Sequence, residues 1–396
     1  MIKFVENKLR TGRLSEYTDL FTEDKVKKIH KFHKSLEHFY NVTRLEKLDA
    51  LAHDMGIFKL YIKNESRRGN FNAFKLLGGS YAVANIIYRK LGLDIGQVGK
   101  KVHKKKENLE MIKSLTFAAA SDGNHGKSVA WAANILGAKS IVYMPKGTAE
   151  ERIEAIEKLG GEVVVTDLTY DGCVSLVSKL GKEKGWEVVL DTATDGDPQV
   201  ASWVMEGYAT MAREVIKQLR HHLVKPTHVF LQAGVGSMAA SVIATLANEY
   251  YPDMPKFYIV EPHQANCFYQ SGKAQKPVSV EGNLDSISAG LSCGVVNPQA
   301  WNIIKDFADG FISSDDYLAA NGMRILGNPL DMDPVIVSGE SGAITTGVLE
   351  KIVRTDLKDK LELNDNSVVL LFSTEGATDR ENYRNVVWYG KYNEGE

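Results

Sequence analysis

The sequence contains little cysteine. Its 396 residues include three cysteines, Cys173, Cys267 and Cys293, which are widely spaced and form no Cys-x-x-Cys pair. Small disulfide-stapled domains carry more cysteines at closer spacing, and structural zinc sites use paired cysteine and histidine ligands. The sequence therefore predicts buried free thiols, no disulfide framework and no metal site.

Long apolar runs and an excess of one charge are also missing. No segment approaches the roughly 18 apolar residues of a membrane helix, and the opening segment MIKFVENKLR lacks the apolar centre of a signal peptide. Lys and Arg number 48 against 50 Asp and Glu, which gives a formal charge of -2. Nucleic-acid-binding proteins usually carry a basic domain. These absences predict a protein of the reducing cytoplasm with neither a nucleic-acid nor a membrane partner.

The sequence does contain a series of short apolar segments separated by longer amphipathic ones. The segments predicted as strands are FKLYIKNE, LTFAAA, SIVYMP, EVVVTD, WEVVLD, THVFLQA, KFYIVEP and SVVLLFS. Apolar strands that alternate with helices are typical of mostly parallel sheets covered on both faces. The strands cluster before and after about residue 195, where DTATDGDPQVAS is rich in turn formers. We predict the α/β class, with two mostly parallel twisted sheets, each flanked by helices, and a cleft between them.

Two loops that follow predicted strands resemble phosphate-binding motifs. SDGNHGKS ends like a nucleotide-binding P-loop, but Ser121 stands where that motif has its first glycine. GVGSMA fits the G-x-G-x-x-A pattern of dinucleotide-binding folds, and the next strand ends in Glu261, an acidic residue of the kind that binds a ribose. Such a loop shows only that backbone N–H groups at a helix N-terminus can bind a phosphate. A nicotinamide-dependent dehydrogenase therefore stays open at this point.

One lysine stands among apolar residues at the start of a predicted helix. Lys75 lies in the segment NAFKLLGG. A desolvated lysine has a lowered pKa and can act as a base or form a Schiff base. An ordinary lysine that extends its stem along apolar surface is the commoner case, but three loops at strand ends accompany this one. They contain SDGNHG, GVGSM and STEG, and in a parallel sheet such loops can meet in one crevice.

Together these motifs resemble the fold type II pyridoxal-phosphate enzymes, the family of serine and threonine dehydratases, tryptophan synthase β and cysteine synthase. The matching segments are SDGNH, NAFKLLGG, GVGSM, the strand end VEP and the run GESGA, and they extend over most of the chain from about Phe58 to Tyr389. Within that family, FNAFKLLGG, ASDGNHG, YMPKG, DTAT, QAGVGSMA, SGESGA and STEGATD are similar in order and spacing to the diaminopropionate ammonia-lyases. In this family Glu261 closes a strand and need not bind a ribose.

The resemblance implies a function and a domain organisation. The implied reaction is a pyridoxal-phosphate-dependent α,β-elimination of 2,3-diaminopropionate, as the D and also the L isomer, to pyruvate and two ammonia. The alternatives are a serine or threonine dehydratase of the same fold and, with less support, the dehydrogenase. The implied large, cofactor-binding domain comprises residues 1–85 and 198–396, and residues 86–197 form a smaller mobile α/β domain. A homodimer is also implied.

The resemblance assigns cofactor-binding roles to residues of the matching motifs. Lys75 would form the Schiff base with the cofactor and act as a base at Cα. Asn124 would hydrogen-bond the phenolic oxygen of the ring, and either Ser373 or Thr374 would face the pyridine nitrogen. A neutral hydroxyl there would leave this nitrogen largely unprotonated and favour elimination over transamination. The remaining cofactor-binding candidates are Phe74, Gly234, Val235, Gly236, Ser237, Met238 and Glu340.

Two aspartates are the predicted catalytic partners of Lys75. Asp122 stands where racemase-like members have a serine on the cofactor face opposite the lysine, so its carboxylate could take the Cα proton from the D isomer. Asp122 and Asp191 could also attract the cationic β-ammonium group of the substrate. Each has an ordinary structural alternative, a helix N-cap for Asp122 and a turn residue for Asp191. The substrate-binding candidates are Ser121, Asp122, Gly123, His125 and Asp191.

Overall fold

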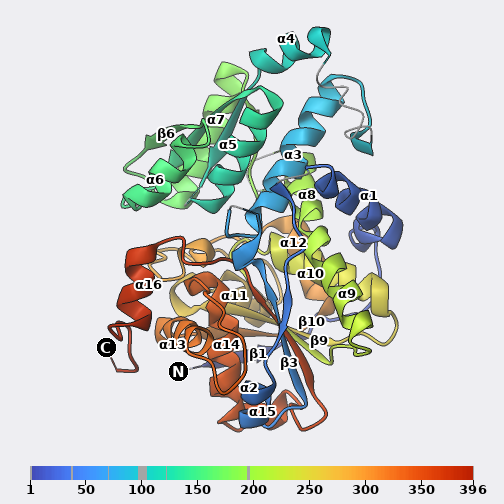
Figure 1. The fold of residues 1–396 in the computed structure, drawn as a ribbon, viewed down its shortest axis with the longest axis vertical. Helices are drawn as coiled ribbons and strands as arrows, with labels where there is room; N and C mark the ends of the chain where they lie inside the picture. The colour runs from blue at the N-terminus through green and yellow to red at the C-terminus, as the bar shows by residue number, and fades with distance from the viewer. Residues whose placement is uncertain are drawn as a thin grey trace.

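The structure is a computed structural model that describes residues 2–36, 39–69, 71–96, 105–121, 123–193 and 197–395. Within these ranges the chain forms one sheet of seven strands and one of four. Figure 1 shows the smaller sheet and its helices above the larger sheet, with α3 and α8 extending upward beside them. The predicted α/β class, with mostly parallel sheets flanked by helices, is confirmed.

The larger sheet has its most apolar strands in the middle. Its order is β1 (Lys3–Glu6), β10 (Ala308–Ser314), β9 (Lys256–Pro262), β8 (His228–Gln232), β11 (Val368–Ser373), β3 (Lys59–Asn64) and β2 (Leu45–Lys47). The edge strands β1 and β2 pair antiparallel, and the pairs between them are parallel. Strands β8 and β11 are buried along their whole length, as expected for strands covered on both faces.

The smaller sheet is parallel throughout. Its order is β6 (Glu162–Val165), β5 (Lys139–Met144), β4 (Thr116–Ala120) and β7 (Glu187–Val188). Predicted strand WEVVLD is shortened to β7, because the chain leaves the sheet after Val189 donates to the Ala118 carbonyl at 2.8 Å. This departure carries Asp191 away from the sheet.

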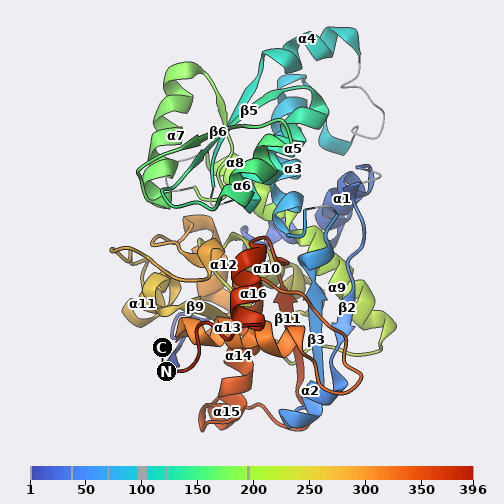
Figure 2. The same ribbon diagram turned by 60° about the vertical axis from the view of Figure 1, so that its left-hand side comes forward.

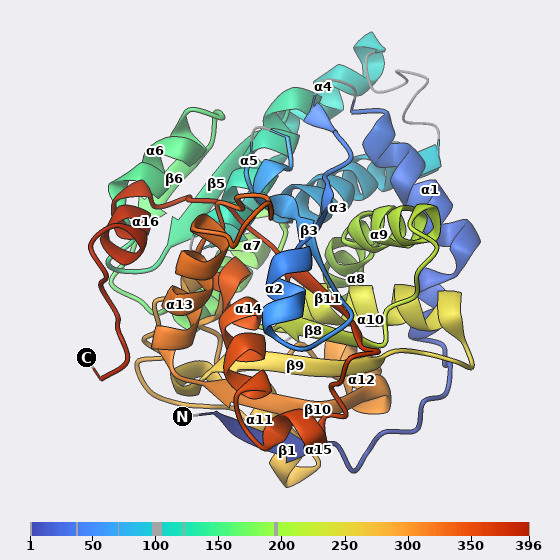
Figure 3. The same ribbon diagram turned by 60° about the horizontal axis from the view of Figure 1, so that its bottom comes forward.

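Helices cover the faces of both sheets. Figure 3 shows α13 and α14 on one side of the larger sheet and α9, α10 and α12 on the other, and two separate apolar cores lie beneath them. Figure 2 shows α5, α6 and α7 around the smaller sheet. None of the helices in the described ranges is long and apolar enough to span a bilayer. The helices are α1 Glu23–Lys34, α2 Asp49–Asp54, α3 Lys75–Lys90, α4 Lys106–Ser114, α5 Asn124–Leu136, α6 Glu150–Glu157, α7 Tyr170–Lys184, α8 Pro198–Gly207, α9 Ala209–His221, α10 Ser237–Tyr250, α11 Cys267–Ala274, α12 Pro298–Phe307, α13 Asp316–Gly327, α14 Glu340–Val353, α15 Leu357–Lys360 and α16 Arg380–Val387.

Local sequence explains where several of these helices begin and end. Asp197 caps α8 by accepting from the Gln199 N–H, and Pro198 occupies the first turn, where its missing N–H costs nothing. Gly137 ends α5 in the left-handed conformation, at φ +92°. All three cysteines are buried, as predicted.

Candidate active site

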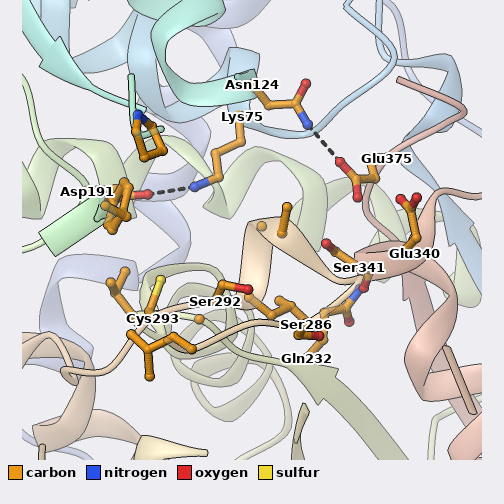
Figure 4. A pocket seen from close by; sticks show the side chains of 18 of the residues that line it. Lys75, Asn124, Asp191, Gln232, Ser286, Ser292, Cys293, Glu340, Ser341 and Glu375 are labelled. Carbon is orange, nitrogen blue, oxygen red and sulfur yellow. Dashed lines mark hydrogen bonds and ion pairs between the residues drawn. The ribbon is translucent and has the colours of Figure 1, made fainter. Parts of the chain in front are cut away.

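A pocket of about 780 Å³ lies where the carboxyl ends of both sheets meet. From the smaller sheet it is lined by Asn124 after β4, by residues 145–149 after β5 and by residues 167–170 after β6. From the larger sheet it is lined by residues 232–239 at the end of β8 and by Thr374 and Glu375 after β11. Ligands of open α/β sheets bind at the carboxyl ends of the strands. Figure 4 shows the side chains that converge there.

Lys75 and Asp191 form an ion pair in this pocket. Lys75 is the first residue of α3, and its Nζ lies 2.6 Å from Asp191 Oδ2 (Figure 4). Tyr170 donates to the other carboxylate oxygen at 2.8 Å. Burial alone would raise the pKa of Asp191, but the charge of Lys75 and the hydrogen bonds from Lys75 and Tyr170 outweigh it and lower this pKa below its ordinary value. Asp191 is therefore ionised at neutral pH.

The glycine loop lies at the N-terminus of α10. Gly236 has φ +93°, and a Cβ there would lie 2.3 Å from the ring of Phe268. A Cβ on Gly234 would lie 3.0 Å from Cys293 Sγ, so the loop accepts no larger residue without movement. The Ser237 hydroxyl donates to the Asp191 carbonyl at 2.7 Å. The backbone N–H groups of this loop, rather than that hydroxyl, are thus the donors suited to an anion. Val235 and Met238 also line the pocket.

The asparagine loop places one of its residues in the pocket. Asn124 begins α5, and its Nδ2 donates to Glu375 Oε2 at 2.7 Å. Ser121 is fully buried and holds the turn, since its Oγ accepts from the N–H groups of Gly123 and Gly126 at 2.9 and 2.8 Å. His125 is buried with Nε2 at 2.9 Å from the Val189 carbonyl. Ser121, Gly123 and His125 do not line this pocket, and Asp122 lies outside the described residues.

The structure distinguishes the two hydroxyl candidates at the end of β11. Ser373 is fully buried and donates to Ser338 Oγ at 2.8 Å. Thr374 lines the pocket, and its Oγ1 accepts a hydrogen bond from Gln232 Nε2 at 3.1 Å. Of the two, Thr374 is the residue that a bound molecule can reach.

The two other predicted cofactor-binding residues also line the pocket. Glu340, the first residue of α14, accepts a hydrogen bond from Asn382, and burial raises the pKa of its carboxyl. Phe74 packs its ring against that of Tyr208, with centroids 4.7 Å apart. Both positions agree with a place in the wall of the site.

Several polar residues of the pocket were not assigned from the sequence, among them Gln232, Glu375, Tyr170 and Tyr208. Gln232 and Glu375 stand inside the matching segments QAGVGSMA and STEGATD, so their strand-end positions could have indicated them. Tyr170 and Tyr208 come from helix termini far from the motifs and had no such signal. Conversely, Glu261 is absent from the lining: it is fully buried and accepts from the N–H groups of Phe268 and Tyr269, each at 2.8 Å. Because both carboxylate oxygens of Glu261 accept from backbone N–H groups inside the protein, Glu261 is not placed to bind a ribose.

The pocket is suited to a phosphorylated aldehyde cofactor. Lys75 supplies an amine, and the glycine loop supplies N–H groups at the start of a helix. Three buried polar atoms of lining residues have no hydrogen-bond partner within the described part of the chain: Tyr208 Oη, Gln232 Oε1 and Ser341 Oγ. Buried polar atoms are normally paired, so these are positions that a bound molecule or water would complete. Among the described residues, no group of three or more metal-ligating side chains occurs.

Comparisons with known proteins agree with this chemistry. The model of the family described as pyridoxal-phosphate dependent enzyme matches residues 36–374. The chain is 46% identical over 395 residues to diaminopropionate ammonia-lyase of Escherichia coli K12, with 99% of this chain and 97% of that protein covered. The corresponding Salmonella typhimurium enzyme is 44% identical over 368 residues, with 91% of each chain covered.

Solved structures of diaminopropionate ammonia-lyase are also similar to this chain. A crystal structure of the E. coli enzyme in complex with an aminoacrylate–pyridoxal-phosphate azomethine intermediate has a TM-score of 0.91 and 44% identity, with 99% of this chain and 98% of that chain covered. The same enzyme has been solved in complex with D-serine, with a TM-score of 0.90. On the site and these matches, the chain belongs to the pyridoxal-phosphate-dependent enzyme family and, within it, to the diaminopropionate ammonia-lyases.

Proposed function

We propose that this protein eliminates ammonia from 2,3-diaminopropionate, taking the D and also the L isomer, and releases pyruvate and a second ammonia. The observation that carries the proposal is the Lys75–Asp191 pair, which faces the glycine loop across a pocket. Bound pyridoxal phosphate supplies an electron sink for the electron pair left at the substrate Cα. The residues of the chain bind, orient and move protons around that centre.

Lys75 and Asp122 are the proposed bases. Lys75 Nζ would take the Cα proton of the L isomer from its own side of the pocket. Asp122 would take the Cα proton of the D isomer from the opposite side, a role that rests on the sequence. One active site with two bases would accept both enantiomers.

Asp191 is proposed to bind the β-ammonium group of the substrate. Because its pKa is lowered by Lys75 and Tyr170, Asp191 has no proton to donate at neutral pH. The β-amino group must then bring its own proton and depart as ammonia, with the electron pair of the broken C–N bond. A carboxylate that favours the ammonium form assists this departure and selects a diamino acid over serine.

Further roles complete the proposal. The N–H groups of residues 234–238 would hold the cofactor phosphate, Asn124 its phenolic oxygen and Thr374 its pyridine nitrogen, with Phe74 and Glu340 in the surrounding wall. Ser121, Gly123 and His125 would shape the substrate loop through the turn that Ser121 holds. Division into domains 1–85 plus 198–396 and 86–197 is supported by the strands of the smaller sheet, which lie between residues 116 and 188. A homodimer is proposed by analogy with the family, and a cytoplasmic location from the scarcity of cysteine and the absence of long apolar runs.

The decisive experiment compares substrates in one cuvette. Purified protein is mixed with pyridoxal phosphate, its visible absorbance band is recorded, and pyruvate is measured after D- or L-diaminopropionate, serine or threonine is added. We expect the band to change and pyruvate to form far faster from both diaminopropionate isomers than from serine. Faster release from serine, or of 2-ketobutyrate from threonine, would assign the protein to the dehydratases instead.

A further inference from the structure

The side-chain amide of Gln232 joins three parts of the pocket wall. Gln232 is the last residue of β8 and is 2% exposed. Its Nε2 lies 3.0 Å from the Ser341 carbonyl oxygen, 2.8 Å from the Phe372 carbonyl oxygen and 3.1 Å from Thr374 Oγ1. Figure 4 shows Gln232 beside Ser341 on the wall of the pocket. The amide therefore connects the start of α14 with the end of β11.

These contacts fix which end of the amide faces Thr374. Backbone carbonyl oxygens only accept hydrogen bonds, so two of the three neighbours require the nitrogen on that side. An amide nitrogen has two hydrogens to donate and does not accept, so the three oxygens share these two hydrogens and Thr374 Oγ1 is an acceptor in its contact with Gln232. The hydroxyl hydrogen of Thr374 cannot be directed at Gln232. Within the described residues, this is the one hydrogen bond that Thr374 Oγ1 makes.

The surroundings of Thr374 place its hydroxyl group at the pocket. The Thr374 carbonyl oxygen accepts from the Phe74 N–H at 3.0 Å, which holds the backbone in place beside the lysine loop. Ser373 on one side faces Ser338 inside the protein, whereas Thr374 lines the pocket. The Thr374 hydroxyl is thus occupied as an acceptor from within and available as a donor toward the pocket.

We propose that Gln232 is a positioning residue that makes Thr374 a hydrogen-bond donor to the pyridine nitrogen of the cofactor. This inference rests on the proposed function and assigns a role to Gln232, for which the motifs gave none. A threonine hydroxyl is far too weak an acid to transfer its proton to a pyridine. The nitrogen therefore accepts a hydrogen bond and stays unprotonated. Gln232 sets this state through Thr374 without reaching the reacting atoms.

The test measures the hydrogen bonding and protonation of the pyridine nitrogen by NMR. Holoenzyme is prepared with pyridoxal phosphate labelled with 15N in the ring, and the 15N resonance is recorded for wild type, Gln232→Met, Thr374→Val and the double variant. In Gln232→Met we expect a downfield shift toward the position of Thr374→Val, because the nitrogen loses a fixed donor. The double variant should shift no further than Thr374→Val. Gln270→Met, which removes an amide that bonds Asn266 outside the pocket, should keep the wild-type resonance.

Two results from the variants would overturn the inference. One is a wild-type resonance in Gln232→Met; the other is a double variant whose shift is the sum of the single shifts. A measurement on unaltered protein covers the case in which Gln232→Met does not fold: the wild-type resonance should be that of an unprotonated nitrogen from pH 6 to 9, and a pyridinium resonance contradicts the proposal. The visible band and pyruvate release of wild type test the proposed function separately.

Discussion

The protein buries two groups of opposite charges, and they differ in what surrounds them. The first, called here the closed network, has side chains that are at most 1% exposed and consists of Lys63, Glu65, Arg68 and Glu214. The second, called the pocket pair, consists of Lys75 and Asp191, whose side chains are 16% and 5% exposed. Both contain a lysine bonded to a carboxylate at nearly the same distance, 2.7 and 2.6 Å.

Protein groups complete the closed network on every side that the structure describes. Arg68 donates to Glu65 Oε1 and Oε2, both at 2.7 Å, and to the two oxygens of Glu214 at 2.9 and 2.8 Å. Tyr40 adds a hydrogen bond to Glu214 at 2.6 Å. The pocket pair instead shares its pocket with the unpartnered atoms of Tyr208, Gln232 and Ser341. A satisfied network stabilises the fold, whereas a partly satisfied one marks a place for a ligand.

Substitution of the pocket lysine should have the largest effect. Lys75→Ala removes the amine that binds the cofactor, and we expect pyruvate release to fall by at least about 10³-fold, as is usual for loss of a covalent catalytic group. The free energy of unfolding of the cofactor-free protein should fall by less than for loss of a partner in the closed network, because water in the pocket can solvate the Asp191 carboxylate. Steady-state pyruvate formation measures the loss of activity, and urea unfolding measures the change in stability. Unchanged activity would place the reaction elsewhere.

Substitution in the closed network should lower stability and leave turnover unchanged. Glu214→Gln leaves Lys63 and Arg68 with reduced compensation in the interior, and loss of one partner of a buried pair costs about 3–5 kcal/mol. The folded fraction should keep its turnover number. The control is Glu154→Gln, which breaks an exposed pair with Lys158 and should leave the free energy of unfolding nearly unchanged. If both variants unfold alike, the closed network has no special place in the fold.

Acid should next distinguish the pocket pair from the interior beside the closed network, where the ring of His33 stacks on that of Tyr40. Burial lowers the pKa of His33, which lies beside Thr210 and the Leu77 carbonyl, to about 3. Between pH 6.5 and that value the unfolded chain binds a proton that the folded chain excludes, so stability falls as pH falls below about 6.5. The wild-type advantage over His33→Asn should shrink by about 2 kcal/mol between pH 7.5 and 5.

Asp191→Asn is the matched control for that titration. The pKa of Asp191 is lowered, so its contribution to stability is fully present above its ordinary value of 3.8 and is lost only below it. Urea unfolding at pH 7.5, 6 and 5 should therefore show the same pH dependence in Asp191→Asn and wild type. A flatter dependence in Asp191→Asn would mean that the pocket pair titrates in this range.

Continuous apolar runs predicted most of the strands, and irregular ones did not. β8 and β11 are short apolar runs that only a buried parallel strand fits, so their positions were predictable. β10 was missed because ADGFISS mixes glycine, aspartate and serine with few apolar residues, and its burial comes from neighbours far along the chain. The short edge strands β1 and β2 carry too few residues for a pattern.

The site was predictable where a motif carries it. Lys75, Asn124 and the glycine loop stand in recognisable segments. The choice between Ser373 and Thr374 depended on Ser338, which lies beside Ser373 only in the folded chain. Tyr208 meets Phe74 because α3 packs against α8, and no spacing in the sequence encodes that contact. Sequence patterns do not reveal single polar residues that reach the site only because helices and strands pack together.

The smallest effect offers the closest comparison, because the same substitution can be made in both regions. Tyr170 donates to Asp191 at 2.8 Å and Tyr40 donates to Glu214 at 2.6 Å. In Tyr170→Phe, water in the pocket can replace the lost donor, so stability should hold while turnover falls about tenfold, the equivalent of one hydrogen bond of about 1.4 kcal/mol. In Tyr40→Phe, turnover should hold, and stability should fall by about 1–2 kcal/mol because the carboxylate loses a donor in the interior. Urea unfolding gives the free energy of unfolding of each variant, and pyruvate assays give its turnover number. If both substitutions lower the same one of these two quantities, the distinction between the pocket pair and the closed network is wrong.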